Sequence, residues 1–219
     1  MDSKSNAKSG LVERESRHQC LIYEGAPSQQ LPALAAMIKR KLDEGHRCLY
    51  LNSRPMVAGI RSYLAAIGID VESDIAKTRL VLSSESTASA GDGFHVDMML
   101  DNLEDALDQA LSDGYKGLWA SGDMTWEFGS EKNFAKLLEY EYRLEELMHK
   151  RPELCGICQY HQDTLPSEVT RQALLTHRMI FINETLSRVN PNYCSSGLSS
   201  GQLATNSQLD KSQYPTGSS

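Results

Sequence analysis

The sequence predicts an α/β protein, a three-layer α/β/α domain with a mainly parallel sheet over residues 17–193. Short apolar runs rich in Val, Ile, Leu, Cys and Tyr recur along the chain with little alternation, as in strands that are covered on both faces. Amphipathic segments with helical spacing separate these runs. Strands that alternate with helices imply right-handed β-α-β crossovers, and hence a parallel sheet.

Each element follows from its local pattern. Six strands are expected, at His18–Tyr23, Arg47–Asn52, Arg79–Ser83, Lys116–Ser121, Leu154–Tyr160 and Met179–Asn183. Five helices are expected at 31–42, 57–67, 99–111, 134–148 and 167–177, where apolar residues recur every three or four positions. Glycines follow the first three helices as stop signals, at Gly45, Gly68 and Gly114.

Both ends of the chain differ from the middle. Residues 1–16 are polar and show no periodicity, which predicts a flexible N-terminal segment. Residues 194–219 are rich in Ser, Gly, Gln and Thr. Such a segment cannot bury enough apolar surface to offset its ordering entropy, so a disordered tail is expected.

Charge and hydropathy exclude several classes of partner. The formal net charge of −7 argues against nucleic acid and anionic membranes, because both need a basic surface. No apolar stretch approaches the roughly 20 residues that span a bilayer, and the N-terminus lacks the apolar core of a signal peptide. A cytoplasmic protein is therefore expected, and its five cysteines are expected to be reduced.

The first strand runs into the loop EGAPSQQ and then a helix. A nucleoside triphosphatase carries G-x-x-x-x-G-K-[ST] at such a junction, and its lysine contacts the outer phosphates. Gly25 is present here, but Gln29 and Gln30 stand where the lysine and the hydroxyl residue are expected. The loop is a degenerate phosphate loop, or only a turn with Ser28 near the helix start. The helix N-terminus could still attract an anion.

Several segments occur in a characteristic order: His18-x-Cys20, EGAPSQQ, DEGHRCLYLNS, IRSYLAAIGIDV, GYKGLWASGDMTWEF, LLEYEYRLEEL, LCGICQY and LLTHRMIFIN. Together they resemble the MEDS sensory domain family. The resemblance implies a RecA/KaiC-like P-loop scaffold without a functional Walker A motif. It also implies a signal-input domain for small hydrocarbon-like molecules, attached to kinase or transcription-factor modules. Few structured residues follow Asn183, so a stand-alone sensor that signals through a histidine kinase or a transcription regulator is expected.

Histidine and cysteine side chains form one candidate site. His18 and Cys20 share a face of their strand, as do Cys158 and Tyr160, and His177 precedes the last strand. Such ligands could hold zinc, but they would have to converge from three strands whose order the sequence does not give. Closely spaced zinc pairs are absent. No metal and no other cofactor are expected, and buried structural roles or pocket-lining polar groups are favoured.

A C-x-x-C pair lies on the fifth strand. Cys155 and Cys158 are three residues apart, so their side chains point to opposite faces of a strand. Neither a disulfide nor shared chelation is expected from this pair.

A second candidate site follows the fourth strand. Asp123 occupies the position of the magnesium-supporting acid of P-loop enzymes, and Met124, Trp126 and Phe128 come directly after it. These side chains could form an apolar pocket with Asp123 as its polar anchor. The alternative is a carboxylate that accepts loop amides, beside aromatic residues in the core.

One further carboxylate is expected to be buried. Glu141 lies on the apolar stripe of its helix, where a carboxylate needs a partner, and Arg54 and Arg61 are the expected candidates.

The function predicted from these features is that of a non-catalytic sensor that binds a small molecule. Without the phosphate-binding lysine, catalysis is not expected. Two alternatives remain open: a divergent nucleotide-binding protein or weak ATPase, supported by Asp123, and an interaction module, for example a homo-oligomer formed through exposed helices.

Overall fold

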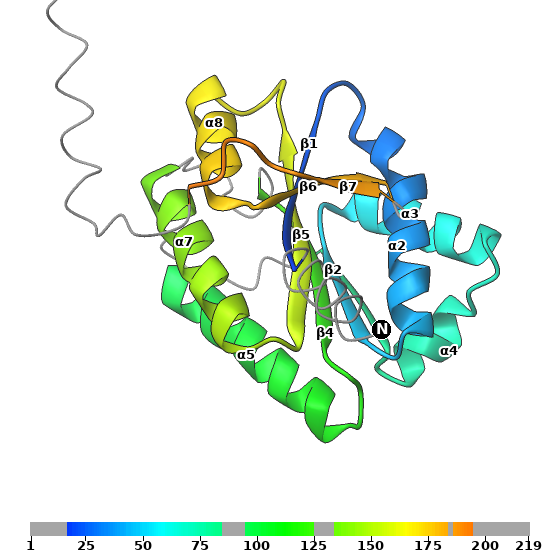
Figure 1. Ribbon diagram of the computed structural model, residues 1–219. Coiled ribbons are helices and arrows are strands. Elements are labelled where there is room, and N and C mark those ends of the chain that lie inside the picture. Colours follow the sequence, from blue (N-terminus) through cyan, green and yellow to red (C-terminus); the bar gives the residue numbers. More distant parts are fainter. Residues whose placement is uncertain (1–16, 85–94, 125–133, 184–185, 195–219) are drawn as a thin grey trace, which may run out of the picture.

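One seven-stranded sheet forms the centre of the described part of the chain (Figure 1). The computed structural model describes residues 17–84, 95–124, 134–183 and 186–194. The strand order is β3-β2-β4-β5-β1-β6-β7, and every neighbouring pair is parallel except β6 and β7. The strands are β1 (His18–Tyr23), β2 (Arg47–Leu51), β3 (Leu80–Ser83), β4 (Leu118–Asp123), β5 (Leu154–His161), β6 (Met179–Asn183) and β7 (Leu186–Val189).

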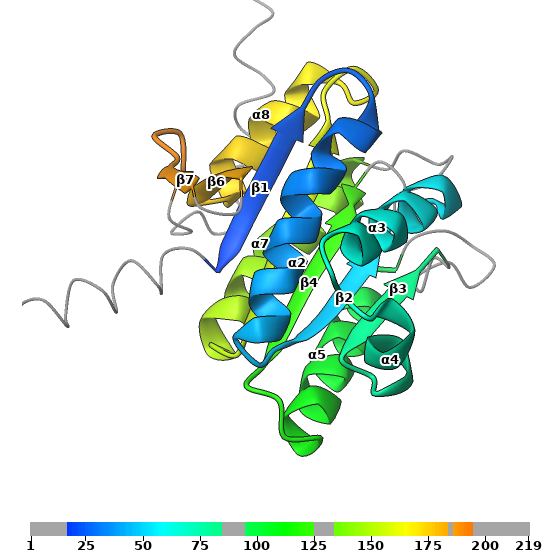
Figure 2. The same cartoon turned by 90° about the vertical axis from the view of Figure 1, so that its right-hand side faces the viewer.

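Helices cover both faces of the sheet (Figure 2). One face carries α2 (Leu31–Asp43), α3 (Arg54–Ala66) and α4 (Val71–Ala76), and a short 3-10 helix, η1 (Pro27–Gln30), precedes α2. The opposite face carries α5 (Val96–Ser112), α7 (Phe134–Lys150) and α8 (Ser167–Thr176). We call these the α2 face and the α7 face. The predicted three-layer fold is confirmed. Among the described residues, no helix has both the length and the apolar character needed to cross a membrane.

Most predicted elements are present within two residues of their predicted ends. The predicted stops Gly45, Gly68 and Gly114 all have φ between 86° and 91°, the left-handed conformation that ends helices. The prediction missed α4, a helix of six residues whose N-terminus is capped by Asp70. It also missed β7, because the run LSRV is short, alternates in polarity and follows β6 after two residues.

Strand periodicity divides the central side chains between two cores. Along β1, His18 and Cys20 point to the α7 face, whereas Leu21 and Tyr23 point to the α2 face. On β5, Cys155 packs against the α2-face core and Cys158 belongs to the α7-face core, as predicted for the C-x-x-C pair. A site on one face is therefore separated from the other face by the sheet itself.

Candidate functional site

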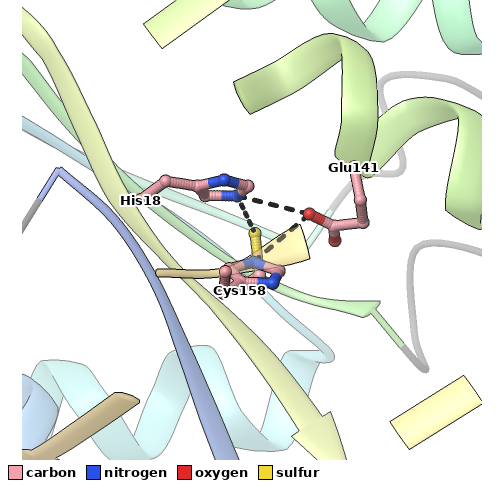
Figure 3. Close-up of side chains that lie close together, drawn as sticks. His18, Glu141 and Cys158 are labelled. Carbon is pink, nitrogen blue, oxygen red and sulfur yellow. Dashed lines mark hydrogen bonds and ion pairs between the residues drawn. The ribbon is translucent and has the colours of Figure 1, made fainter. Parts of the chain in front are cut away.

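Four buried side chains meet on the α7 face (Figure 3). His18 comes from β1, Cys158 from β5, Glu141 from α7 and His177 from the end of α8. One nitrogen, sulfur or oxygen atom of each lies within 4.8 Å of those of the other three. We call this group the His/Glu/Cys cluster.

The strand order creates this cluster. β1 lies between β5 and β6, and Cys20 pairs with Cys158 in register. His18 is two residues before Cys20 and so points to the same face near Cys158. The next strand, β6, begins two residues after His177. These three side chains therefore converge from segments far apart in the sequence, and the inward stripe of α7 adds Glu141.

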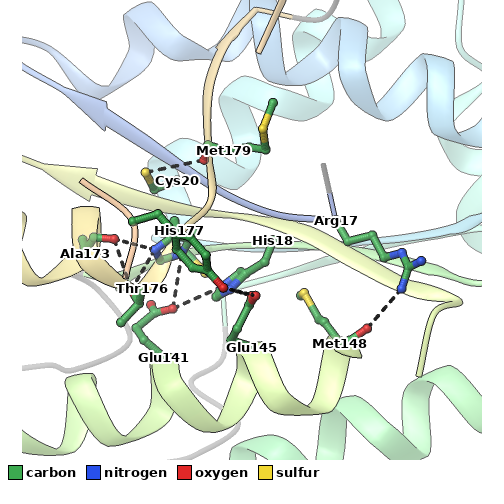
Figure 4. Close-up of polar contacts among 12 residues, drawn as sticks. Arg17, His18, Cys20, Glu141, Glu145, Met148, Ala173, Thr176, His177 and Met179 are labelled. Carbon is green, nitrogen blue, oxygen red and sulfur yellow. Dashed lines mark hydrogen bonds and ion pairs between the residues drawn. The ribbon is translucent and has the colours of Figure 1, made fainter. Parts of the chain in front are cut away.

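Glu141 is at the centre of the contacts (Figure 4). Its Oε2 atom lies 3.3 Å from Nε2 of His18 and 3.3 Å from Nε2 of His177, and the Tyr160 hydroxyl donates to Oε1. The predicted burial of Glu141 is confirmed, but the predicted arginine partners are wrong. Arg61 pairs with Glu72 instead, because α3 carries Arg54 and Arg61 on the other side of the sheet.

Each histidine has a second partner for its Nδ1 atom. Nδ1 of His18 lies 2.8 Å from Oε2 of Glu145, one turn after Glu141 on α7. Nδ1 of His177 lies 2.8 Å from the carbonyl oxygen of Ala173. Nε2 of His18 also lies 3.6 Å from Sγ of Cys158. The two Nδ1 contacts fix the ring orientations so that both Nε2 atoms point into the cluster.

Burial and mutual contact shift the pKa values in opposite directions. Burial lowers the pKa of His18, but its contacts with Cys158, Glu141 and Glu145 outweigh burial and raise it well above the ordinary value. Burial and the nearby His18 lower the pKa of His177 to about 4. Burial raises the pKa of Glu141, but His177, His18 and Tyr160 outweigh that effect and lower it.

Two further groups at the cluster have shifted pKa values. The pKa of Glu145 is lowered, because its contacts with His18 outweigh its burial, and burial raises the pKa of Cys158 to about 12. The cluster thus brings two carboxylates with lowered pKa values to one imidazole with a raised pKa.

Other predicted site residues lie beside the cluster. Tyr160 is fully buried and contacts Glu141. Cys20 is buried on the same face, its Sγ 3.8 Å from the carbonyl oxygen of Met179, and burial raises its pKa to about 12. The structure thus brings together His18, Cys20, Cys158, Tyr160 and His177.

Asp123 lies apart from the cluster, on the α2 face. Its Oδ2 atom accepts a hydrogen bond of 3.2 Å from the Tyr23 hydroxyl. The next residue, Met124, is buried in the α7-face core, so Asp123 does not anchor a pocket that includes Met124. Trp126 and Phe128 lie outside the described residues.

The degenerate phosphate loop has partners within the chain. The Gly25 N–H donates to Oδ2 of Asp163 over 2.7 Å, and Nε2 of His161 lies 2.8 Å from the Gly25 carbonyl oxygen. Ser28 and Gln29 are exposed in η1, and no side chain caps that helix. A carboxylate of the protein thus occupies a loop amide that a phosphate would otherwise use.

A small apolar cavity adjoins the cluster on the α7 face. Its volume is about 30 Å³, and Cys158 forms part of its wall. Ala120, Gly122 and Gly156, which have small or no side chains, form its floor on β4 and β5. Its remaining walls include the side chains of Met99, Met124, Tyr140, Leu144 and Met148. A groove of about 500 Å³ between α5 and the β2–β3 edge shares Leu51, Met99 and Leu103 with the cavity.

Two features of this face were not predicted from the sequence. Glu145 lies on the same inward stripe of α7 as Glu141, four residues later, and that spacing is a detectable signal. The three small floor residues are also visible in the sequence. They indicate a cavity floor only when β4 and β5 are known to be neighbouring strands.

Comparisons with known proteins identify the family and support the fold. The family model described as MEDS, the methanogen/methylotroph, DcmR sensory domain, matches residues 17–178. The transcriptional repressor DcmR of Methylorubrum extorquens (strain DSM 6343 / CIP 106787 / DM4) is 26% identical over 160 residues, which cover 73% of this chain and 57% of that protein. The chain thus spans little more than half of that relative's length.

A solved structure supports the fold. An uncharacterized protein from Pyrococcus horikoshii, crystallised with an unknown peptide, matches with a TM-score of 0.57 at 14% identity. The match covers 75% of this chain and 76% of the other, and at this identity it speaks for the fold alone. Since the family model covers most of the described sheet and helices, the chain belongs to the MEDS sensory domain family.

Proposed function

We propose that the chain is a non-catalytic sensory domain that binds a small apolar molecule, such as a simple hydrocarbon derivative, in the cavity beneath α5 and α7. Membership of a sensory domain family supports a role in regulation. The observation that carries the ligand class is the cavity itself, which has a floor of small residues and three methionines in its walls. Methionine side chains adapt readily to a guest, because they are unbranched and flexible.

The position of α7 offers a way to transmit the signal that a ligand has bound. Tyr140, Leu144 and Met148 line the cavity from α7, and Glu141 and Glu145 of the same helix contact the His/Glu/Cys cluster. A molecule that enlarges the cavity would displace α7 against that cluster. We propose that a partner protein, a histidine kinase or a transcription regulator, detects this movement. The DcmR relative is a transcriptional repressor, which favours transcriptional control as the output.

The nucleotide-binding alternative is less well supported. The loop lacks the lysine that a triphosphate needs, and Asp163 adds a negative charge at the Gly25 amide. A carboxylate at this position repels phosphate. We therefore expect no magnesium-dependent binding of ATP.

Methionine methyl groups provide the test. In a protein with ¹³C-labelled methionine, xenon and a series of small alkanes, alcohols and haloalkanes should shift the resonances of Met99, Met124 and Met148. Met37 and Met56, which are buried on the α2 face, serve as internal controls. Shifts confined to the α2-face methionines, or micromolar ATP affinity, would contradict the proposal.

A cavity-filling variant sharpens the test. A Cβ atom at position 122 would lie 3.1 Å from the flexible end of Met124, so Gly122→Ala should fold while reducing the cavity. We expect this added methyl to weaken binding by about 10-fold or more, since one methylene in an apolar pocket is worth about 1–3 kcal/mol. Ser62→Thr adds a methyl to the exposed surface of α3 and should leave binding unchanged.

A further inference from the structure

Two buried atoms in the His/Glu/Cys cluster have no hydrogen-bond partner among the described residues. They are Nε2 of His177 and Oε2 of Glu141, which lie 3.3 Å apart, and the same Oε2 atom also lies at ion-pair distance, 3.3 Å, from Nε2 of His18. His177 is fully buried and Glu141 is 1% exposed. Burying polar atoms without partners is unfavourable, so their mutual orientation requires an explanation.

The hydrogen on His177 can be placed from its contacts. A carbonyl oxygen only accepts hydrogen bonds, so the 2.8 Å contact with Ala173 puts a hydrogen on Nδ1 of His177. A neutral imidazole carries one ring hydrogen, and Nε2 then holds a lone pair. That lone pair faces a carboxylate oxygen. Two acceptors at this distance repel each other unless a proton or a metal ion lies between them.

His18 has a comparable contact at its Nδ1 atom. Its Nδ1 faces the carboxylate of Glu145 at 2.8 Å, which leaves Nε2 to face Cys158 and Glu141. Histidines that bind metals usually donate Nδ1–H or Nε2–H to a carboxylate or a backbone carbonyl, which orients the other nitrogen towards the metal. His18 has the carboxylate form of this support and His177 has the carbonyl form (Figure 4).

Three of the six separations among the four atoms match tetrahedral coordination. Ligand atoms about 2.0–2.3 Å from a tetrahedral zinc ion lie about 3.3–3.8 Å from one another. The observed separations include 3.3 Å for each Nε2–Oε2 pair and 3.6 Å between Nε2 of His18 and Sγ of Cys158. All four atoms lie within 4.8 Å of one another, so small side-chain movements would complete the shell.

We propose that the His/Glu/Cys cluster binds one borderline divalent transition-metal ion, first of all Zn²⁺, through Nε2 of His18, Nε2 of His177, Sγ of Cys158 and Oε2 of Glu141. Imidazole and thiolate ligands select such ions over Mg²⁺ and Ca²⁺, which prefer oxygen. Cys158 loses its thiol proton to solvent on binding. The proposal is independent of the proposed sensory function, because it rests on different atoms and a different assay.

A surface hollow lies beside the site. Its volume is about 50 Å³, and it is lined by His18 and Glu145 together with Arg17, His149, Arg178 and Tyr193. The expectation that no metal binds depended on an unknown strand order, and the order β5-β1-β6 removes that obstacle.

Metal titration of chelator-treated full-length protein tests the proposal. We expect one Zn²⁺ per chain with submicromolar affinity by calorimetry, and no heat from Mg²⁺. Co²⁺ should give the visible bands of a tetrahedral site together with a thiolate-to-cobalt charge-transfer band. A protein that binds neither Zn²⁺ nor Co²⁺ would overturn the proposal.

Two matched serine variants assign the sulfur ligand. Cys158→Ser should abolish the charge-transfer band and weaken Zn²⁺ binding about 100-fold or more, whereas Cys20→Ser, which alters a buried thiol on the same face outside the cluster, should change neither. Equal affinity in the two variants would place the metal elsewhere. Circular dichroism confirms that each variant folds.

Glu145 is a positioning residue in this proposal. Glu145→Gln should weaken Zn²⁺ binding about 10–100-fold while keeping the charge-transfer band, as expected for a residue that supports a ligand. Loss of the band in this variant would show that Glu145 is itself a ligand and would overturn the assigned ligand set.

Discussion

The two faces of the sheet differ in how their polar groups are satisfied. Near the carboxyl ends of the strands, where parallel sheets usually bind ligands, Asp123 accepts from Tyr23 and the Gly25 amide donates to Asp163. The α2 face also holds a buried atom without a hydrogen-bond partner, Oε1 of Gln159, whereas on the α7 face two such atoms, on His177 and Glu141, point at each other. At the carboxyl ends of the strands, which resemble a nucleotide site, the protein's own groups thus occupy the polar positions. The side chains suited to binding a ligand lie in the core of the α7 face.

The largest effect is expected on the α7 face. Replacing Glu141 by Ala leaves His18 buried without one of its two carboxylate contacts, and removes the acceptor of the Tyr160 hydroxyl. Breaking a buried ion pair in this way typically costs about 3–5 kcal/mol of unfolding free energy. Urea unfolding of the metal-free wild type and variant measures this difference in unfolding free energy. Glu139→Ala, on the exposed side of α7, should change stability by less than about 0.5 kcal/mol. Similar losses in both variants would show that burial of Glu141 is unimportant.

A smaller loss is expected on the α2 face. Tyr23→Phe removes the hydroxyl that donates to buried Asp123, and loss of one hydrogen bond to a charged group costs about 1.5–3 kcal/mol. The same unfolding assay applies. Tyr63→Phe on α3, where the side chain is 40% exposed, serves as the control and should be nearly neutral. If Tyr23→Phe proved more costly than Glu141→Ala, the proposed difference between the faces would be reversed.

Alkaline pH tests Tyr23 of the α2 face when the wild type and a variant are compared, because burial also raises the pKa values of Cys20, Cys158 and Tyr160 on the α7 face. Burial raises the pKa of Tyr23 and of Tyr50 above the ordinary tyrosine value, and Asp123 adds to both shifts. The folded state therefore keeps these protons after the unfolded state has lost them. Stability is unaffected well below pH 10 and falls as pH rises above about 10, by up to about 1.4 kcal/mol per pH unit for each group.

The slope of stability against pH provides the measurement. Urea unfolding between about pH 9 and 11 should show a shallower decline for the Tyr23→Phe protein than for the wild type. Buried Cys48 contributes with the same sign in both proteins, because burial raises its pKa too. Parallel slopes would mean that Tyr23 does not titrate differently in the folded and unfolded states.

The smallest effect is expected at the degenerate phosphate loop. Asp163 is exposed, so Asp163→Ala should change the unfolding free energy by less than about 0.5 kcal/mol. The variant frees the Gly25 amide but supplies no positive charge, so ATP binding should stay undetectable by calorimetry. Adding Gln29→Lys tests whether charge is the missing component. Magnesium-dependent ATP binding by Asp163→Ala alone would show that the loop is blocked rather than degenerate.

Much of the architecture was determined by the local sequence. Apolar runs located β1 and β6 with their observed ends, and Gly45, Gly68 and Gly114 ended helices where left-handed backbone is needed. Period-two alternation also assigned faces correctly: Cys155 and Cys158 lie on opposite sides of β5. These properties depend on residues a few positions apart, so a single segment contains the information.

The candidate site depended on the tertiary structure. His18 and Cys158 are 140 residues apart, and they meet only because the crossovers place β1 beside β5. The inward position of Glu141 was visible from its helical stripe, but its partners were not, because they depend on which sheet face α7 covers. Sequence periodicity specifies the direction of a side chain within its own element. The packing of the elements decides what that side chain meets.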